Sequence, residues 1–544
     1  MILIVSPESS CSQPVGESWA IMMGQQRKQA SFMDVQGLGK TPVVAEDSFY
    51  GQMALHGGEL AREEWFVDLY SRQGRPSAPP TLLSKVLLLM FHDNVSDREA
   101  EERARYDLRW KVALGLGIDE VGFDATALCR FRARLVVHEQ ERLFFERTIR
   151  MARERGLVSS EVAEVIDSTP VLGAGAVQDT YNLLRSAVRK MLKAVRARPE
   201  AHSRLLEMLK RKDYDETGKP EIDWTDPKAR EGLLNDFVGD ARRVLGETEG
   251  LELDAAGRAA RELLAAVTEQ DIEDRGDGTV VIKRGVAKDR VISTRDPEMR
   301  HGRKSSKGRF DGHKAHIMEN RETEIITGVA VTAANVPDAE PLPEMLDRQR
   351  EMGVTAKEVT GDTAYGSGEV RKEMAGRQVQ LVAPVPQEGV RKDFFPKSAF
   401  DIDLSARTCR CPAGHVAKMK GHRKEGQTGS FEFGRVCRKC PLRGQCTDSK
   451  YGRVVGVHQY EELLQLSRAE QQTDAFKEQY RKRPIIERKI AELVWHGMRQ
   501  ARYIGKSKVL LQLAWTAGML NVKRMFRPTA ASGEPMAELR PVLV

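Results

Sequence analysis

The stretch Glu358-Val-Thr-Gly-Asp-Thr-Ala-Tyr-Gly-Ser367 decides how the chain is expected to fold. A short β-prone run ends in Gly361-Asp362, small and turn-forming residues follow, and the next segment has a helical pattern. This order predicts that Asp362 lies at the carboxyl end of a strand, which is the edge where open α/β sheets carry their chemistry. Asp362 is therefore the first candidate for a catalytic residue.

Two further acids lie in contexts that could bring them to the same point. Asp167 follows an apolar strand at residues 162–166, and Pro170 is expected to break that strand. Glu487 lies in the first turn of a helix that is expected to begin at Pro484. Clustered carboxylates hold the divalent ions of phosphoryl-transfer sites, and hard oxygen ligands favour Mg²⁺. Without a cation, the three carboxylates would repel one another and raise each other's pKa values.

Other acids remain open as alternatives. Glu492 lies on the same predicted helix as Glu487, and Asp311 or Asp296 could replace a strand acid. The chain has 79 acidic residues, so an isolated acid carries little weight as a catalytic candidate.

Length and composition indicate a multidomain protein. The 544 residues suffice for two to four domains, and the net charge of +7 is modest for this length. No run approaches the roughly 18 apolar residues of a membrane span. The opening Met1-Ile-Leu-Ile-Val5 is too short for a signal peptide and has no basic residues before it. These features predict a cytoplasmic protein.

The predicted organisation has six parts. Residues 1–45 are polar and aperiodic and are expected to be poorly ordered, with Met22, Met23 or Met33 as the true start. The remaining parts are a helical DNA-binding domain (46–157), the first part of an α/β core (158–386), a Cys-rich insertion (387–465), the second part of the core (466–528) and a tail (529–544).

The helical region contains a pattern typical of DNA-binding folds. A buried helix is expected over residues 82–91, and Ser96 with Glu99 forms a capping box for the next helix, which is expected to run to Gly115. Asp124 is expected to cap a third helix. Its basic residues predict a helix–turn–helix docked on DNA, although a helical bundle with a solvated basic face has the same pattern. These basic residues are Arg130, Arg132 and Arg134.

Alternating strands and helices predict an α/β core with a mixed sheet. Strands are expected at residues 280–282 and 290–293, directly before Gly361-Asp362, and at 379–382, with a hairpin at 313–317 and 325–332. Helices are expected from Asn335 to Met352 and near residues 370–374. Charged amphipathic helices between about residues 175 and 272 are predicted to form a helical insertion.

Five of the seven cysteines lie between Cys409 and Cys446, which favours a metal site over a disulfide framework. A Cys-x-x-Cys pair with two more distant sulfurs suits a tetrahedral structural Zn²⁺. The preferred ligands are Cys411, Cys437, Cys440 and Cys446. Cys409 or His415 is a spare ligand, and Cys11 and Cys129 stand alone.

The last module is basic. Basic residues outnumber acids between Lys477 and Lys508, which predicts a track for DNA beside the candidate active site. The residues suited to such a track are Arg481, Lys482, Arg488, Arg499, Arg502, Lys506 and Lys508.

Taken together, these motifs resemble those of a known family. The matching segments are Val165-Ile-Asp-Ser-Thr169, Thr360-Gly-Asp-Thr-Ala-Tyr-Gly366, and a Tyr480, Arg483 and Glu487 series with spacings of two and three residues. Over residues 59–526 the chain resembles the DDE transposases of bacterial insertion sequences, which have a ribonuclease H-like core. One position departs from the family, because Val494 stands where a lysine is common, and Lys489 or Arg488 could take over its contact with DNA.

The resemblance implies a function for these residues. Asp167, Asp362 and Glu487 would bind catalytic Mg²⁺ (or Mn²⁺), first for hydrolysis at the ends of the element and then for attack of the freed 3′-hydroxyl on target DNA. Tyr480 and Arg483 would contact phosphates or flipped bases, although Tyr480 could equally serve helix packing. Double-stranded DNA is the implied partner, bound by a homodimer. The alternatives are a related nuclease without strand transfer and an inactive DNA-binding derivative.

Overall fold

A computed structural model describes residues 43–70, 76–216, 218–304, 308–386, 394–421 and 426–526. The candidate starts Met22, Met23 and Met33, the lone Cys11 and the predicted tail lie outside these residues. Within the described part, contacts divide the chain into two compact units. One unit contains the residues up to 157, 171–313 and from 492 onward, and the other contains 158–170 and 314–491. No helix in the described part is both long and apolar enough to cross a membrane.

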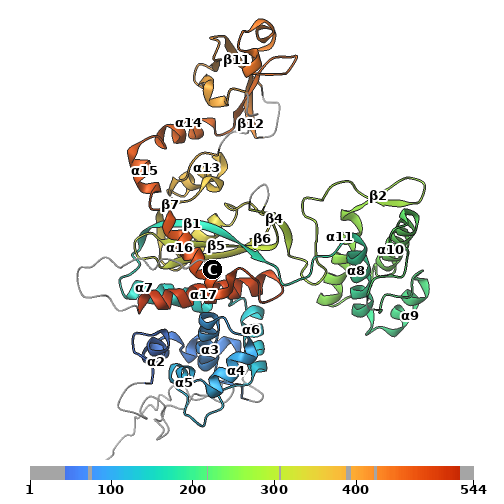
Figure 1. Cartoon of the computed structure of the whole chain (residues 1–544), viewed down its shortest axis with the longest axis vertical. Helices are drawn as coiled ribbons and strands as arrows, with labels where there is room; N and C mark the ends of the chain where they lie inside the picture. Colours follow the sequence, from blue (N-terminus) through green and yellow to red (C-terminus); the bar gives the residue numbers. More distant parts are fainter. Residues whose placement is uncertain are drawn as a thin grey trace, which may run out of the picture. The chain divides into compact units, whose positions relative to one another are not determined.

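A mixed β-sheet carries the candidate site (Figure 1). Its strand order is β4-β5-β1-β7-β8, and β6 pairs with β5. Strand β7 runs parallel to both β1 and β8, whereas β4 and β5 are antiparallel. The sheet confirms the predicted α/β class and agrees with a ribonuclease H-like core. The strands are β1 (Glu161–Leu172), β4 (Arg300–Arg303), β5 (Arg309–Asn320), β6 (Ile326–Ala333), β7 (Thr355–Thr360) and β8 (Gln380–Val382).

Strand β1 is longer than the sequence suggested. Pro170 was expected to end the strand near Asp167, but β1 continues to Leu172. Proline removes one ladder donor. Backbone pairing resumes beyond it, because the N–H of Leu172 donates to the carbonyl of Arg499 (2.9 Å) and the N–H of Ala501 donates to the carbonyl of Leu172 (2.8 Å). The predicted strand end was therefore wrong, and Asp167 lies within a continuous strand.

Two helices, α12 (Leu342–Glu351) and α13 (Gly368–Gly376), contribute to the core of the second unit. The expected helix from Asn335 begins only at Leu342, because prolines at 337, 341 and 343 fit no helix position beyond the first turn. The apolar side chains of these helices pack with those of the sheet in one cluster. Its largest members include Ile166, Met318, Met345, Leu346, Val359, Tyr365 and Met374.

The expected strand at residues 290–293 is absent from the described structure. Both polar backbone groups of Val291 instead bond to the side chain of Gln270, at 2.9 and 3.0 Å. The carbonyl of Ile292 accepts from the N–H of Gln178 (2.8 Å). Because side chains and a loop satisfy this backbone, the apolar run needs no strand partner.

The helices before the sheet form a bundle that the last helix of the described chain completes (Figure 1). Helix α17 (Lys506–Met525) packs against α3, α6 and α7. The buried Trp515 of α17 stacks on Phe144 of α7 with ring centroids 5.0 Å apart. Gly518 permits this approach, because a Cβ there would lie 2.7 Å from the Phe144 ring. The other helices are α2 (Phe49–Leu60), α3 (Pro80–Asp93), α4 (Asp97–Tyr106), α5 (Leu108–Leu114), α6 (Ala125–Val137) and α7 (Leu143–Glu154).

The helix starts follow the local signals. The Ser96 side chain accepts from the N–H of Glu99 (3.3 Å), and Asp124 accepts from the N–H of Thr126 (2.8 Å), which confirms both predicted caps. The single helix expected up to Gly115 is two helices. Asp107 separates them, because its side chain accepts from the N–H of Arg109 (2.9 Å) and caps α5.

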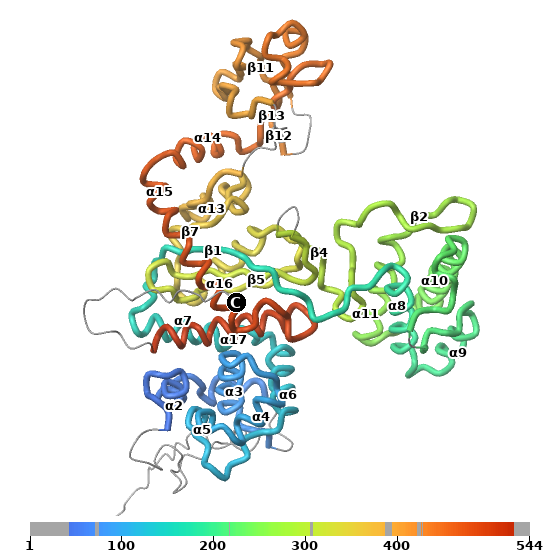
Figure 2. The backbone as a smooth tube through the Cα atoms, viewed as in Figure 1, coloured from blue at the N-terminus to red at the C-terminus, as the bar shows by residue number. Residues whose placement is uncertain are grey.

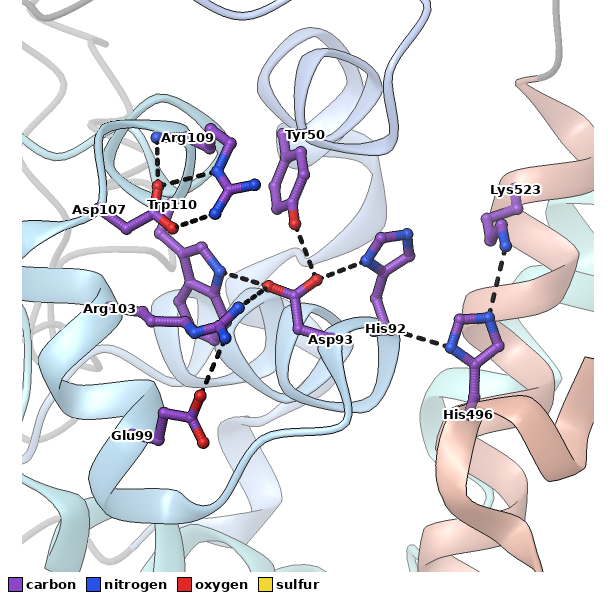
Figure 3. A network of polar contacts seen from close by, with 10 residues as sticks. All are labelled: Tyr50, His92, Asp93, Glu99, Arg103, Asp107, Arg109, Trp110, His496 and Lys523. Carbon is purple, nitrogen blue, oxygen red and sulfur yellow. Dashed lines mark hydrogen bonds and ion pairs between the residues drawn. The ribbon is translucent and has the colours of Figure 1, made fainter. Parts of the chain in front are cut away.

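A buried carboxylate organises the end of α3 (Figure 3). Asp93 accepts hydrogen bonds from the hydroxyl of Tyr50 (2.8 Å), the rings of His92 (2.7 Å) and Trp110 (2.8 Å), and the guanidinium of Arg103 (2.7 Å). Burial alone would raise the pKa of Asp93, but the hydrogen bonds outweigh it and lower the pKa to about 2. Asp93 therefore remains ionised and ties α2, α3, α4 and α5 together.

The same corner fixes the turn at Val494–Met498 (Figure 3). Nδ1 of His496 lies 2.9 Å from the carbonyl of His92, so it must donate, and Nε2 then accepts from Lys523 (3.4 Å). Burial and the charge of Lys523 lower the pKa of His496 to about 4, in keeping with a neutral ring. Gly497 has φ = +91°, and a Cβ there would lie 2.4 Å from the side chain of Asn94.

The helical insertion has a core of its own. It comprises α8 (Thr180–Val195), α9 (Pro199–Met208), α10 (Pro227–Glu247) and α11 (Ala255–Gln270), with a small hairpin of β2 (Ile272–Asp274) and β3 (Val280–Ile282). The predicted apolar face of α8 is buried in this core, which confirms an amphipathic helix. Its residues are Leu183, Leu184, Ala187, Val188, Met191, Leu192 and Val195.

The Cys-rich segment forms a separate five-stranded antiparallel sheet, which the chain enters after β8 and leaves through α14 (Glu461–Glu470) and α15 (Asp474–Tyr480) (Figure 2). The catalytic-candidate helix α16 (Pro484–Leu493) follows and begins at Pro484, as predicted. The five strands are β9 (Asp401–Asp403), β10 (Thr408–Arg410), β11 (Val416–Lys420), β12 (Gln427–Glu432) and β13 (Val454–His458).

A buried acid in β1 predicts a pH-dependent stability. Glu164 is fully buried and accepts from Thr327 (2.8 Å) and Gln349 (2.7 Å). Burial, with a smaller contribution from the charge of Glu319, raises the pKa of Glu164 from 4.5 to about 8. Its contribution to stability is therefore complete below pH 4.5 and is lost as the pH rises through 8.

We expect Glu164→Gln to remove this loss, because glutamine is never ionised. At pH 8 the variant should unfold at a higher temperature than the wild type. Its free energy of unfolding should be larger by on the order of a few kcal/mol, and this difference should shrink towards pH 4.5. Thermal unfolding over a pH series measures this. An equal difference at both ends of the series would show that Glu164 does not titrate as described.

Candidate active site

Strand pairing brings the first two candidate acids level with each other. In the parallel pair of β1 and β7, Val165 lies opposite Thr360. Asp167 and Asp362 each lie two residues further along, so Asp167 within β1 is level with the point where β7 ends. Asp362 follows the last residue of β7, as predicted from the sequence. The sheet therefore presents both carboxyl groups at one edge.

Arg483 joins the first acid to the third. Its Nη2 donates to Asp167 (2.7 Å), and its Nη1 donates to Glu487 (2.7 Å). Arg483 lies in the turn before α16, and Glu487 is four residues further, in the first helical turn. A planar guanidinium has the geometry to bridge two carboxylates.

The pKa of Asp167 is perturbed by its surroundings. Burial, together with the charges of Asp362 and Asp338, raises this pKa to about 6, against the opposing effects of the N–H of Ser168 and the Arg483 guanidinium. Perturbation of this kind, by desolvation together with neighbouring carboxylates, is typical of sites that bind a cation.

Contacts in the structure explain the order of residues from Gly361 to Tyr365. The Asp362 side chain accepts from the N–H of Ala364 (2.8 Å), which turns the chain away after β7. Tyr365 is completely buried below this turn, and a Cβ at Gly361 would lie 2.8 Å from its ring. Only glycine therefore fits before Asp362, and the turn fixes the direction of its carboxyl group.

A fourth carboxylate, missed by the sequence reasoning, belongs to this site. Asp338 contributes to the raised pKa values of both Asp167 and Tyr365, so it lies within electrostatic range of both. Lys314 of β5 holds it, donating to Asp338 (2.7 Å) and to the carbonyl of Val336 (2.8 Å). The signal was present in Asn335-Val-Pro-Asp338 directly after β6, but it resembled a helix start.

Tyr480 ends α15 close to the three acids. Its ring stacks on Phe476 at 5.8 Å, so it also serves helix packing. Burial raises the pKa of Tyr480, Arg483 opposes this, and the charges of Asp362, Asp167 and Glu487 add to the increase. Tyr480 is therefore neutral and can donate a hydrogen bond.

The alternative acids each pair with another group. Asp296 is buried against His313 (3.3 Å) and accepts from the N–H of Gly505 (3.2 Å). Asp311 pairs with His301 (2.5 Å), and Glu492 lies 3.7 Å from Lys523. These contacts give all three acids a structural role.

The candidate DNA-contacting residues differ in exposure. Arg132 is buried and forms an ion pair with Asp97, and Arg134 lies over the ring of Tyr70 (4.4 Å). Arg130 is exposed, whereas Lys489 on α16 is only 5% exposed. Of the three arginines in the predicted helix–turn–helix, Arg130 is the most exposed, and their contacts with DNA stay a prediction.

The four preferred zinc ligands line one pocket, together with His415. These ligands are Cys411, Cys437, Cys440 and Cys446. The N–H of Arg453 donates to the sulfur of Cys437 (3.4 Å). Cys409 is fully buried in the hydrophobic core of this sheet. Among the described residues, no three His, Cys, Asp or Glu side chains are already drawn together as metal ligands.

Three family models match the chain. Residues 55–134 match a Transposase domain (DUF772), and residues 268–397 and 410–526 each match a Transposase DDE domain. The chain is an insertion-sequence DDE transposase. Such domains act on DNA and generally use Mg²⁺ or Mn²⁺.

The two DDE matches contain most of the candidate site residues of the transposase, but not all of them. Asp362 lies in the first DDE match, and Tyr480, Arg483 and Glu487 lie in the second. Asp167 lies between the matched segments, and its assignment depends on strand pairing and Arg483. No curated protein and no solved structure matches the chain.

Proposed function

We propose that the transposase cleaves DNA at the ends of an insertion sequence and joins the freed ends to target DNA by Mg²⁺-dependent phosphoryl transfer. The observation that carries this proposal is the double hydrogen bond of Arg483 to Asp167 and Glu487, in a chain whose Asp362 and Glu487 lie within the two DDE matches. It supports one constellation built from β1, β7 and α16.

The carboxylates suit a divalent ion. Asp167, Asp362 and Glu487 offer hard oxygen ligands. Burial and the charges of Asp362 and Asp338 raise the pKa of Asp167, and a bound cation would favour its ionised form. These three residues would hold Mg²⁺, which supplies charge neutralisation and activation of a water or a 3′-hydroxyl. In this structure the positive charge between Asp167 and Glu487 is the guanidinium of Arg483.

Arg483 and Tyr480 would position the DNA. If Asp167 and Glu487 held a metal, the Arg483 guanidinium would be free to bind a phosphate through two parallel hydrogen bonds. The neutral hydroxyl of Tyr480 lies beside it as a further donor. Lys314 holds Asp338 through its ion pair and so limits repulsion against Asp167.

The Cys-rich sheet would carry a structural zinc. One pocket is lined by Cys411, Cys437, Cys440 and Cys446. Burial raises the pKa of the Cys446 thiol, and the three other thiols raise it further. Four sulfur ligands leave no open position, so this zinc would stabilise the fold and take no part in catalysis. We also propose that the transposase works at the nucleoid as a homodimer on paired DNA ends.

A strand-transfer assay tests the proposed function. DNA from the two flanks of the gene is supplied with Mg²⁺ and target plasmid, with either a 3′-hydroxyl or a 3′-deoxy end. We expect joined products with the hydroxyl end and none with the deoxy end, because the hydroxyl is the nucleophile of the joining step. Cut ends without joined products would favour a nuclease, and binding without cleavage would favour an inactive DNA-binding derivative.

A further inference from the structure

We propose a second DNA-binding site on the helical bundle, a basic pocket formed by Arg62, Arg147 and Arg150 around Trp65, which takes the phosphates of a DNA strand outside the three-acid site. The inference rests on DNA being the substrate. It concerns residues that belong neither to the predicted helix–turn–helix nor to the DDE constellation. All of them lie within one compact unit.

The two faces of α7 explain how the pocket arises. Phe144, Phe145 and Ile149 are buried, and Phe144 stacks on Trp515 of α17. This packing directs Arg147 and Arg150, three residues apart, to the opposite face. Arg62, just beyond the end of α2, and Trp65 in the next turn line the same pocket.

The cations of the pocket are arranged for an anion from outside. Arg155 is already neutralised by Glu59 (2.9 Å) and lies over the ring of Phe526 (4.4 Å). Within the described part of the chain, no ion pair joins Arg62, Arg147 or Arg150 to a carboxylate. Three guanidinium groups without such an ion pair in one pocket suit phosphate oxygens.

Arg147 contacts an aromatic side chain in this pocket. Its guanidinium lies 5.2 Å from the centre of the Trp65 ring, and this cation–π contact restrains the guanidinium. Burial lowers the pKa of Arg147, the charges of Arg150 and Arg62 lower it further, and the charge of Glu146 opposes this. The three cations therefore repel one another, and a bound phosphate would relieve that repulsion.

DNA fits these features better than a free phosphate ion does. The pocket spreads its guanidinium groups over α7 and the segment after α2, and an extended polyanion can engage them simultaneously. Glu154 also lines the pocket and opposes an anion there. Removing the charge of Glu154 should therefore have the opposite effect on DNA binding to removing an arginine, which gives a second test.

The test measures duplex DNA binding by the full-length protein over a salt series. Because the chain has six tryptophans, Trp65 fluorescence is taken as the part of the signal that Trp65→Phe removes. Arg147→Gln and Arg150→Gln should each weaken binding about tenfold, and the slope of log affinity against log salt should become shallower by about 0.9 for each arginine that contacts a phosphate. Glu154→Gln should tighten binding. Arg62→Gln, which changes an exposed side chain, gives a variant with little risk to folding.

Arg242→Gln is the matched control, because it removes one charge from an exposed arginine that already pairs with Asp274 (3.0 Å). Its binding and salt slope should equal those of the wild type. The inference is overturned if the folded pocket variants bind as the wild type does, if Arg242→Gln weakens binding equally, or if inorganic phosphate alone changes Trp65 fluorescence while DNA does not. DNA binding through the pocket without cleavage would refute the proposed function but would support the inference that the pocket binds DNA.

Discussion

Asp362→Asn is expected to leave DNA binding intact and to slow DNA cleavage by at least about a thousandfold. Asparagine retains the side-chain oxygen that accepts from the N–H of Ala364, so the turn after β7 is preserved. It removes the negative charge with which Asp362 would bind a metal at the end of β7. Cleavage of labelled DNA ends in Mg²⁺, with binding measured separately, detects the difference.

Two control variants sharpen this test. Glu492→Gln changes an acid just beyond the first turns of α16, which lies 3.7 Å from Lys523, and it should retain cleavage. Glu487→Gln should lose cleavage as Asp362→Asn does. Full cleavage by Asp362→Asn, or loss of cleavage in Glu492→Gln with retention in Glu487→Gln, would show that the three acids are wrongly assigned.

Cys440→Ser is expected to abolish zinc binding and to unfold the Cys-rich sheet. A sheet this small has few buried apolar residues, so a tetrahedral metal would supply much of its folding free energy. The purified transposase should contain about one zinc ion per chain by elemental analysis, and the variant should contain almost none. Thermal unfolding and limited proteolysis at the ends of the Cys-rich segment report the loss of structure.

Two other cysteines serve as controls for the zinc prediction. Cys129→Ser changes an exposed thiol in α6 and should keep the zinc. Cys409→Ala changes a sulfur buried in the core of the sheet, so it should lower stability but leave the zinc content unchanged. Zinc-free wild-type protein with an intact sheet would contradict the prediction, and loss of zinc in Cys409→Ala would mean that Cys409 is a ligand.

The parts of the site that were predictable from sequence depend on local signals. Gly361 and Asp362 mark the end of β7 because a tight turn over Tyr365 follows them. Pro484 marks the start of α16 because proline fits the first helical turn. Caps, turns and alternating patterns act over a few residues, so a single sequence reveals them.

What was missed depends on contacts between distant segments. Strand β1 continues past Pro170 because its partners at Arg499 and Ala501 lie near the other end of the chain. Asp338 joins the acids through the position of β6 and its ion pair with Lys314, and neither follows from a local pattern. The ion pair of Arg132 with Asp97 joins two helices and likewise does not follow from a local pattern.

The packing of α17 has a consequence for engineering. Retargeting a DNA-acting enzyme commonly means replacing its DNA-binding region as a cassette. Here the bundle that contains the DUF772 match is completed by a helix from the opposite end of the sequence, through Trp515, Phe144 and Gly518. A chimera that exchanges only the residues before β1 would join two mismatched halves of one core. The natural cassette is discontinuous, so a functional swap must carry α17 together with the N-terminal helices.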